Sequence, residues 1–124
     1  MLCELHTGIP VYGTLERPIH ARNLVGEIAR IKQEHPGSIE LAVDAAVGEP
    51  WEIGHISLKD EALAPGRAFY RRLPDVGDLS ITGIVDSREN QRKNRGDAGQ
   101  GLAHVYGMAK TISSFIGQWY KEKL

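Results

Sequence analysis

Two apolar runs, each meeting an aspartate at its end, constrain the fold of this chain more than any other feature. The first run covers residues 38–44 and the second covers residues 79–85. The first is nearly all apolar, with Glu40 as the exception, which is typical of a strand that is covered on both faces, and the second is also typical of a buried strand. Each strand is therefore predicted to end on a carboxylate, Asp44 in the first case and Asp86 directly after the second.

Two amphipathic helical segments alternate with these strands. Residues 19–35 place Leu24, Ile28 and Ile31 on one face of a helix. Residues 102–121 predict a longer helix with an apolar stripe. Its members are Leu102, Val105, Ala109, Ile112, Ile116 and Trp119. Strands that alternate with helices predict the α/β class with a largely parallel sheet.

Three further segments have weaker patterns. Residues 11–14 are typical of a short strand. Residues 51–58 alternate imperfectly and predict a strand near an edge of the sheet. Residues 87–101 are polar, basic and rich in glycine, so we expect a solvated loop or a weak helix start there rather than a phosphate site.

Length, charge and cysteine content limit the class of protein. A chain of 124 residues predicts a single domain over residues 1–124. A net charge of -1 predicts no general attraction to nucleic acid or to an anionic membrane. No apolar run approaches the length of a membrane span. The lone Cys3 permits no internal disulfide, which favours a reducing cytoplasm.

Asp44 and Asp86 are the candidates for chemistry that the residues themselves indicate. In open parallel sheets, sites lie beyond the carboxyl ends of the strands. Two carboxylates there can share a proton, one as base and the other as acid. One carboxylate with a histidine can instead ligate a metal. Equally, each aspartate can bond backbone amides in its turn or cap a following helix.

His20 and Asn23 form a second candidate group, at the start of the first long helix. A helix N-terminus favours anions and polarises nearby groups, so these side chains are candidates for lining a cleft. Local capping of the helix is the alternative, and without other information it is favoured.

Four stretches of the chain resemble the YyaC family of sporulation proteins, which is similar to the germination protease of spore-forming bacteria. They are VYGTLERPIHARNL, IELAVDAAVG, LAPGRAFYRRLPDVGDLSITGIVD and GMAKTI. The match runs from about Val11 to Val85 and then thins. The resemblance implies a three-layer α/β/α sandwich with a mostly parallel sheet, similar to that of hydrogenase-maturation proteases.

The resemblance also gives Asp44 a role. In the germination protease, the acid in the strand that resembles LAVDA is one of two aspartates proposed for peptide cleavage. Carried over, that role falls on Asp44. Related maturation proteases hold nickel with acids and a histidine around this cleft. A divalent metal at Asp44 is thus an alternative, although we predict no cofactor and no metal ligands.

Two departures from the family matter. Family members begin with a strand and a Gly-Thr-Asp-rich turn that supplies the other acid, and this chain shows no such segment. We therefore expect the family's first strand to be missing and peptide turnover by this chain alone to be slight. The family is also more apolar over residues 87–101, and usually has asparagine at the position of Asp86.

The leading hypothesis is a sporulation-related, aspartate-type peptidase that acts on peptides or small spore proteins in the cytoplasm of a forespore or mother cell. Asp44 would activate water. His20, Asn23 and Asp86 would contact substrate, and Gly48 would let backbone approach it. The alternatives are a non-catalytic binding or assembly protein on the same scaffold, and a metal-dependent hydrolase of the maturation type. Neither nucleic acid nor membrane is an expected partner, whereas a homo-oligomer is compatible with the sequence.

Overall fold

The computed structural model describes residues 8–65, 73–93 and 98–123, and the side chains of these residues except 91–104 and 123. Helices and strands alternate along the chain. In order, the elements are α1 (Leu24–Glu34), β1 (Leu41–Gly48), the 3-10 helix η1 (Pro50–Glu52), β2 (Ile56–Lys59), β3 (Leu79–Ser87), α2 (Arg88–Lys93) and α3 (Ala98–Lys123). The α/β class predicted from the sequence is confirmed.

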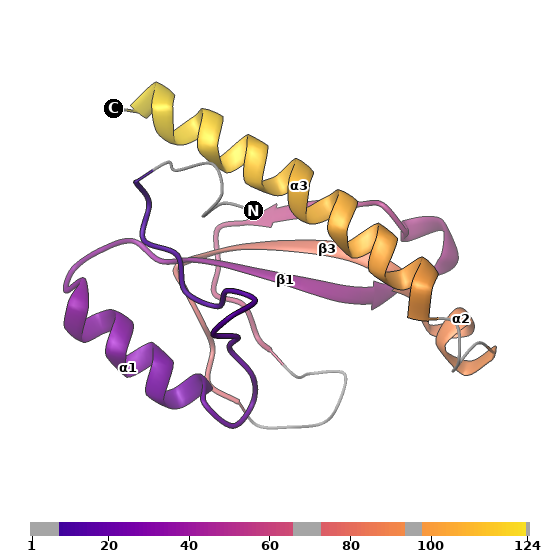
Figure 1. Cartoon of the computed structure of the whole chain (residues 1–124), viewed down its shortest axis with the longest axis horizontal. Coiled ribbons are helices and arrows are strands. Elements are labelled where there is room, and N and C mark those ends of the chain that lie inside the picture. Colours follow the sequence, from indigo (N-terminus) through magenta and orange to yellow (C-terminus); the bar gives the residue numbers. More distant parts are fainter. Residues whose placement is uncertain (1–7, 66–72, 94–97, 124) are drawn as a thin grey trace. The chain divides into compact units, whose positions relative to one another are not determined.

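The three strands form one small mixed sheet in the order β1-β3-β2 (Figure 1). The carbonyl of Glu40, just before β1, accepts a hydrogen bond from the Leu79 N–H at the start of β3, over 3.2 Å. Strand starts therefore meet, and β1 runs parallel to β3. β2 runs in the opposite direction to β3 (Figure 1). The two apolar runs lie in one sheet as predicted, but that sheet is mixed rather than mostly parallel over the described residues.

β3 is the central strand and β1 is an edge strand, and their burial differs accordingly. β3 has Ser80, Ile81 and Gly83 buried, with no residue of the strand fully exposed. In β1, by contrast, Leu41 is 38% exposed and Val43 is 50% exposed. The prediction that this first run is covered on both faces is thus wrong, because the face that carries Leu41 and Val43 is exposed.

The chain divides into two compact units, and β1 and β3 each contribute residues to both. The α3 unit contains Ala45–His55 and Gly83–Leu124, together with the chain up to Val11. The α1 unit contains Tyr12–Asp44 and Ile56–Thr82.

In the α3 unit, the long helix packs on β3 at a glycine. Gly83 is buried, and a Cβ built on it would lie 2.9 Å from the Met108 sulfur. Ile112 and Ile116, one turn and two turns further along α3, are each only 7% exposed. Ile112 and Ile116 of the predicted apolar stripe therefore pack, because the absent side chain of Gly83 lets the helix approach the strand closely. Val105 and Trp119 of the same stripe are 38% and 48% exposed, so the stripe is confirmed only in part.

In the α1 unit, a glycine turn brings the two parallel strands together. Gly77 has a φ of +83°, and a Cβ on it would lie 3.1 Å from the main-chain nitrogen of Ala42. Only glycine fits both the left-handed backbone and this approach. Leu24 of α1, Ala42 of β1 and Ile81 of β3 are buried hydrophobic residues of this unit.

Several element bounds differ from the sequence prediction. The first strand spans Leu41–Gly48 rather than 38–44, and residues 11–14 form no strand. The segment 51–58 divides into η1 and the exposed strand β2, which lies at a sheet edge as predicted. The polar segment 87–101 contains the short helix α2 and the start of α3.

Candidate functional site

Asp44 lies in the middle of β1, not at its end as the sequence predicts. The strand continues through Ala45, Ala46 and Val47 to Gly48. None of these three residues carries a turn signal, so the strand runs on to Gly48, which precedes Pro50. The Asp44 side chain is exposed, whereas Ala42 on the same face of the strand is buried. An accessible carboxylate therefore stands on a strand that is otherwise apolar.

His20 and Asn23 are used in the turn that precedes α1. The Asn23 side-chain oxygen accepts a hydrogen bond from the His20 N–H over 2.8 Å, and its amide group donates to the Pro18 carbonyl over 3.0 Å. The His20 Nδ1 atom accepts a hydrogen bond from the Arg22 N–H over 3.2 Å. These contacts are local, but they lie within the turn before α1, and Asn23 as the N-cap residue makes no side-chain capping bond to the helix.

Polar side chains gather where β1 and β3 end, within the α3 unit. The Arg88 guanidinium pairs with the Glu49 carboxylate over 3.2 Å. The Glu49 N–H donates to the Glu52 carboxylate over 2.9 Å, and the two glutamates form a reciprocal capping box around η1. We call Glu49, Glu52, Asp86, Ser87 and Arg88 the strand-end cluster.

Asp86 and Ser87 complete the strand-end cluster from β3. The Asp86 carboxylate accepts a hydrogen bond from the Ser87 N–H over 2.8 Å. Ser87 is fully buried, and its hydroxyl oxygen accepts a hydrogen bond from the Asn90 N–H over 3.0 Å. Ser87 thus caps α2, and Asp86 lies next to the strand end as predicted, bonded to a local amide.

Gly48 packs against protein and does not border open space. A Cβ on Gly48 would lie 3.1 Å from a carboxylate oxygen of Glu52 and 3.2 Å from the Ile84 side chain. The glycine is therefore needed for the close approach of η1 and β3, which is a different use of its small size from the predicted contact with substrate.

A second polar network joins α1 to the segment before it. The Glu27 carboxylate accepts hydrogen bonds from Arg30 over 2.7 Å and from Arg17 over 3.4 Å. The Arg30 guanidinium also lies over the Tyr12 ring, 4.8 Å from its centroid. The hydrogen bond from Arg30 lowers the pKa of Glu27. Tyr12 donates its hydroxyl to Glu34, and this bond raises the pKa of Tyr12.

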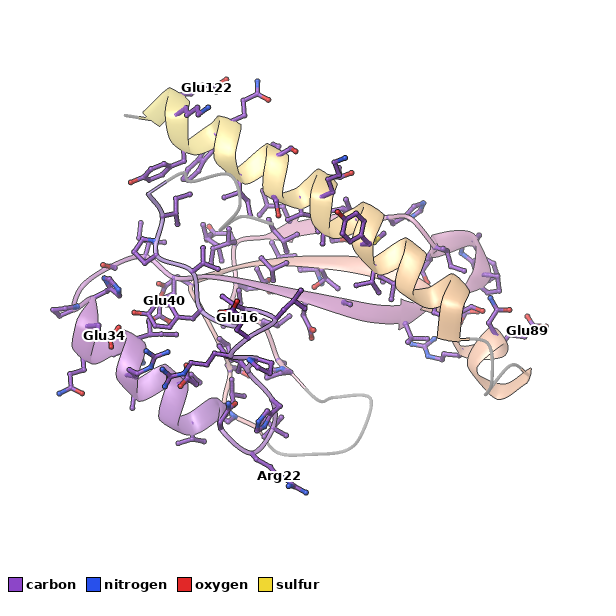
Figure 2. All side chains as sticks on the ribbon, viewed as in Figure 1. Glu16, Arg22, Glu34, Glu40, Glu89 and Glu122 are labelled. Atoms are coloured by element: carbon purple, nitrogen blue, oxygen red, sulfur yellow. The ribbon has the colours of Figure 1, made fainter. Side chains whose placement is uncertain are left out.

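Figure 2 shows the helix that carries this network, with Arg22 just before the start of α1 and Glu34 of the network at its last residue. Glu34 receives both the Tyr12 hydroxyl and Arg30, the latter over 3.6 Å. These contacts hold Tyr12 and Arg17 against α1, although the Nε atom of Arg30 is buried without a hydrogen-bond partner, so the network is structural in character.

Sequence reasoning missed Glu49, Glu52 and Arg88. The signal for the two glutamates was present as Glu49-Pro50-Trp51-Glu52, an acid three residues from another acid with proline at the first helical position. The Arg88 pairing joins residues 39 positions apart, and no local pattern predicts it. Among the described residues, no group of three or more histidine, cysteine, aspartate or glutamate side chains is arranged to hold a metal ion. Nor does any helix in those residues have the length and apolar character to cross a membrane.

Comparison with known proteins identifies a protein family that this chain matches. The family described as "Protein of unknown function (DUF1256)" matches residues 1–115. The "Uncharacterized protein YyaC" of Bacillus subtilis (strain 168) is 41% identical over 80 residues, which are 64% of this chain and 39% of the relative. The chain thus matches well under half the length of that relative. No solved structure matches the chain.

Proposed function

Since the chain belongs to the DUF1256 family, of the YyaC type, we propose that it is an aspartate-type peptidase domain linked to sporulation. Its substrates would be peptides or small spore proteins. Asp44 would be the residue that activates the attacking water.

The observation that carries this proposal is the exposed carboxylate of Asp44 on β1. Aspartate is unfavourable in strands, and the rest of β1 contains only alanine, valine, leucine and glycine. An acid held on rigid sheet backbone, rather than on a loop, has the fixed position that a general base requires. The resemblance of this strand to the catalytic strand of the germination protease supports the same role.

The chemistry assigned to Asp44 is proton abstraction. The ionised carboxylate takes a proton from water as the water oxygen forms a bond to the peptide carbonyl carbon. A second acid then has to donate a proton to the leaving amine. In the germination protease that second acid comes from a Gly-Thr-Asp-rich turn, and residues 1–124 show no counterpart of it, so we expect slow cleavage by these residues alone.

The test compares this chain with its longer relative from Bacillus subtilis on one set of unstructured peptides, with mass spectrometry to detect each cut. We expect cleavage by the relative and much slower cleavage by this chain. Asp44→Asn should lower the residual rate about 100-fold or more, while Asp86→Asn should not. Circular dichroism checks that the fold persists. Cleavage that Asp44→Asn leaves unchanged would exclude the proposed role.

A binding or assembly protein on the same scaffold is the second candidate. It is favoured by the apolar side chains that β1 and Ile39, two residues before it, present to solvent, since Ile39 is 78% exposed. His20 and Asn23, engaged in a local turn, also fit a scaffold without a catalytic cleft. Saturable binding of a peptide without cleavage by either protein would support this candidate over the peptidase.

A further inference from the structure

The distribution of charge along the sheet distinguishes β1 and β3 from the rest of the chain. The chain as a whole is nearly balanced, with 15 lysine and arginine residues against 16 acids. Residues 36–58 and 73–87, which contain β1, β2 up to Leu58 and β3, include no lysine or arginine. Their acids are Glu40, Asp44, Glu49, Glu52, Asp75, Asp78 and Asp86. Such a segment attracts cationic groups.

The start of β1 combines this negative charge with exposed apolar surface. Ile39, Leu41 and Val43 alternate along the strand direction and are 78%, 38% and 50% exposed. Residues of one parity share one face of a strand, so these three side chains lie on one face. Glu40 and Asp44 lie on the other face, on either side of the buried Ala42. We call residues 39–44 the β1 edge, all of which belong to the α1 unit.

The hydrogen-bonding direction of the β1 edge follows from its contact with β3. The Glu40 carbonyl accepts from the Asp78 N–H over 2.7 Å, and the Glu40 N–H donates to the Asp78 carboxylate over 2.9 Å. Main-chain groups in a parallel ladder alternate between the two sides of the strand. Those of Glu40 point toward β3, so those of Leu41 and Val43 point away from it. Figure 2 shows Glu40 at the start of β1.

We propose that the β1 edge binds an extended basic peptide segment as an added strand. Its apolar side chains lie over Leu41 and Val43, and its lysine or arginine side chains lie opposite Glu40 and Asp44. Main-chain bonds to Leu41 and Val43 give this mode its affinity, and the alternating side chains give its specificity. The inference rests on the proposed peptidase function and names its substrate class.

The spacing of the two acids defines the ligand further. Glu40 and Asp44 are four residues apart on one face, so the basic residues of the ligand are also four apart. Apolar residues occupy the alternate positions, which face Leu41 and Val43. A labelled peptide Val-Lys-Val-Ser-Val-Lys-Val satisfies both conditions. The matched control replaces its two lysines with glutamates and keeps its strand propensity.

The test measures binding of the two peptides to the full chain by fluorescence anisotropy. We expect the lysine peptide to bind, more weakly at higher salt, and the glutamate peptide not to bind. Glu40→Gln and Asp44→Asn should each weaken binding roughly two- to fivefold. Val43→Lys should weaken it about tenfold, because it removes an apolar contact and places a like charge at the edge.

Leu58→Lys is the control variant, since Leu58 is 61% exposed on β2, at the opposite edge of the sheet. It should leave binding unchanged. A second measurement needs no variant: hydrogen exchange at the Leu41 and Val43 amides should slow when the lysine peptide is added. Equal binding of both peptides, or unchanged exchange at these amides, would overturn the proposal.

Two further outcomes separate this inference from the peptidase proposal. Binding of the lysine peptide to this chain, with no cut by either this chain or its longer relative from Bacillus subtilis, supports the β1 edge and rejects the peptidase. Cleavage that Val43→Lys leaves unchanged rejects the β1 edge and keeps the peptidase. A chain that dimerises until Val43→Lys is introduced, and that never binds the peptide, assigns this edge to a second copy and overturns the proposal.

Discussion

β1 and β3 are similar in sequence and very different in environment. Each is a short apolar strand with one aspartate, and the two are hydrogen-bonded neighbours. β3 lies between two strands, and its Ile81 is 3% exposed. β1 has a strand on one side, and its Val43 is 50% exposed. An apolar run therefore indicates only that a strand can be buried. The position of the strand in the sheet, central or at an edge, decides whether it is buried.

The largest effect on stability should come from replacing one side chain of each strand with alanine. Ile81→Ala removes a buried side chain from the central strand and should lower the free energy of unfolding by about 2–5 kcal/mol. Val43→Ala removes a half-exposed side chain from the edge and should cost less than about 0.5 kcal/mol. Urea unfolding of both variants measures the contrast. Similar losses would mean that β1 is as buried in solution as β3.

A smaller effect should follow at Gly77, just before β3, where the chain lies close to β1. Gly77→Ala forces a side chain into a left-handed backbone, at about 1–2 kcal/mol. It also places a Cβ 3.1 Å from the main-chain nitrogen of Ala42, and this nitrogen cannot move away freely because it belongs to β1. Gly37, with a φ of +76° and nothing within 4 Å, is the matched control. Gly37→Ala should show only the backbone cost, and an equal loss for both would exclude close strand contact at Gly77.

The comparison of the strands also shows how far the sequence could predict the fold. Runs 38–44 and 79–85 identified both strands and their common sheet, because strand period and β-branched residues are local properties. Edge and central positions depend on pairing with residues far away in the chain. Nothing local distinguishes Val43 from Ile81, so the exposure of β1 could not be predicted.

The candidate site shows the same limit. The sequence located Asp86 correctly beside a strand end, but it ended the first strand at Asp44 because an acid is a common strand terminator. The ladder with β3 outweighed that preference and extended β1 to Gly48. The sequence indicated His20 and Asn23 as a pair, but only the three-dimensional structure could decide between a local turn and the border of a cleft. The Glu49–Arg88 pair could be identified only from the tertiary structure.

An effect of about 1 kcal/mol is expected where β3 passes into α2. Ser87→Ala removes the hydroxyl that accepts from the Asn90 N–H and leaves a buried site without that bond. Ser80 is also buried on β3, 3% exposed, and lies away from any helix start. Ser80→Ala is therefore the control, and it should cost less. Thermal unfolding measures both, and a larger loss for Ser80→Ala would contradict a capping role for Ser87.

The smallest effect on stability concerns acidic side chains, whose surroundings differ between the sheet and α1. Residues 36–58 and 73–87 contain no lysine or arginine, and Glu49 pairs with one arginine from outside them, Arg88. Glu27, by contrast, accepts hydrogen bonds from two arginines. Arg30 lowers the pKa of Glu27 in the folded chain, so ionised Glu27 stabilises the fold above the pKa it has when unfolded. That contribution disappears as the pH falls through the lower, folded pKa.

Glu27→Gln should therefore unfold at a lower temperature than the parent chain near pH 7, and the gap should narrow as the solution is acidified toward pH 3. The partly exposed arginines keep the gap modest, because solvent screens the pair. Glu16→Gln, at an exposed acid outside the helix, should show no gap at either pH. A gap for Glu27→Gln that widens in acid would mean that Glu27 is held protonated in the fold, and that the two arginines do not stabilise its charge.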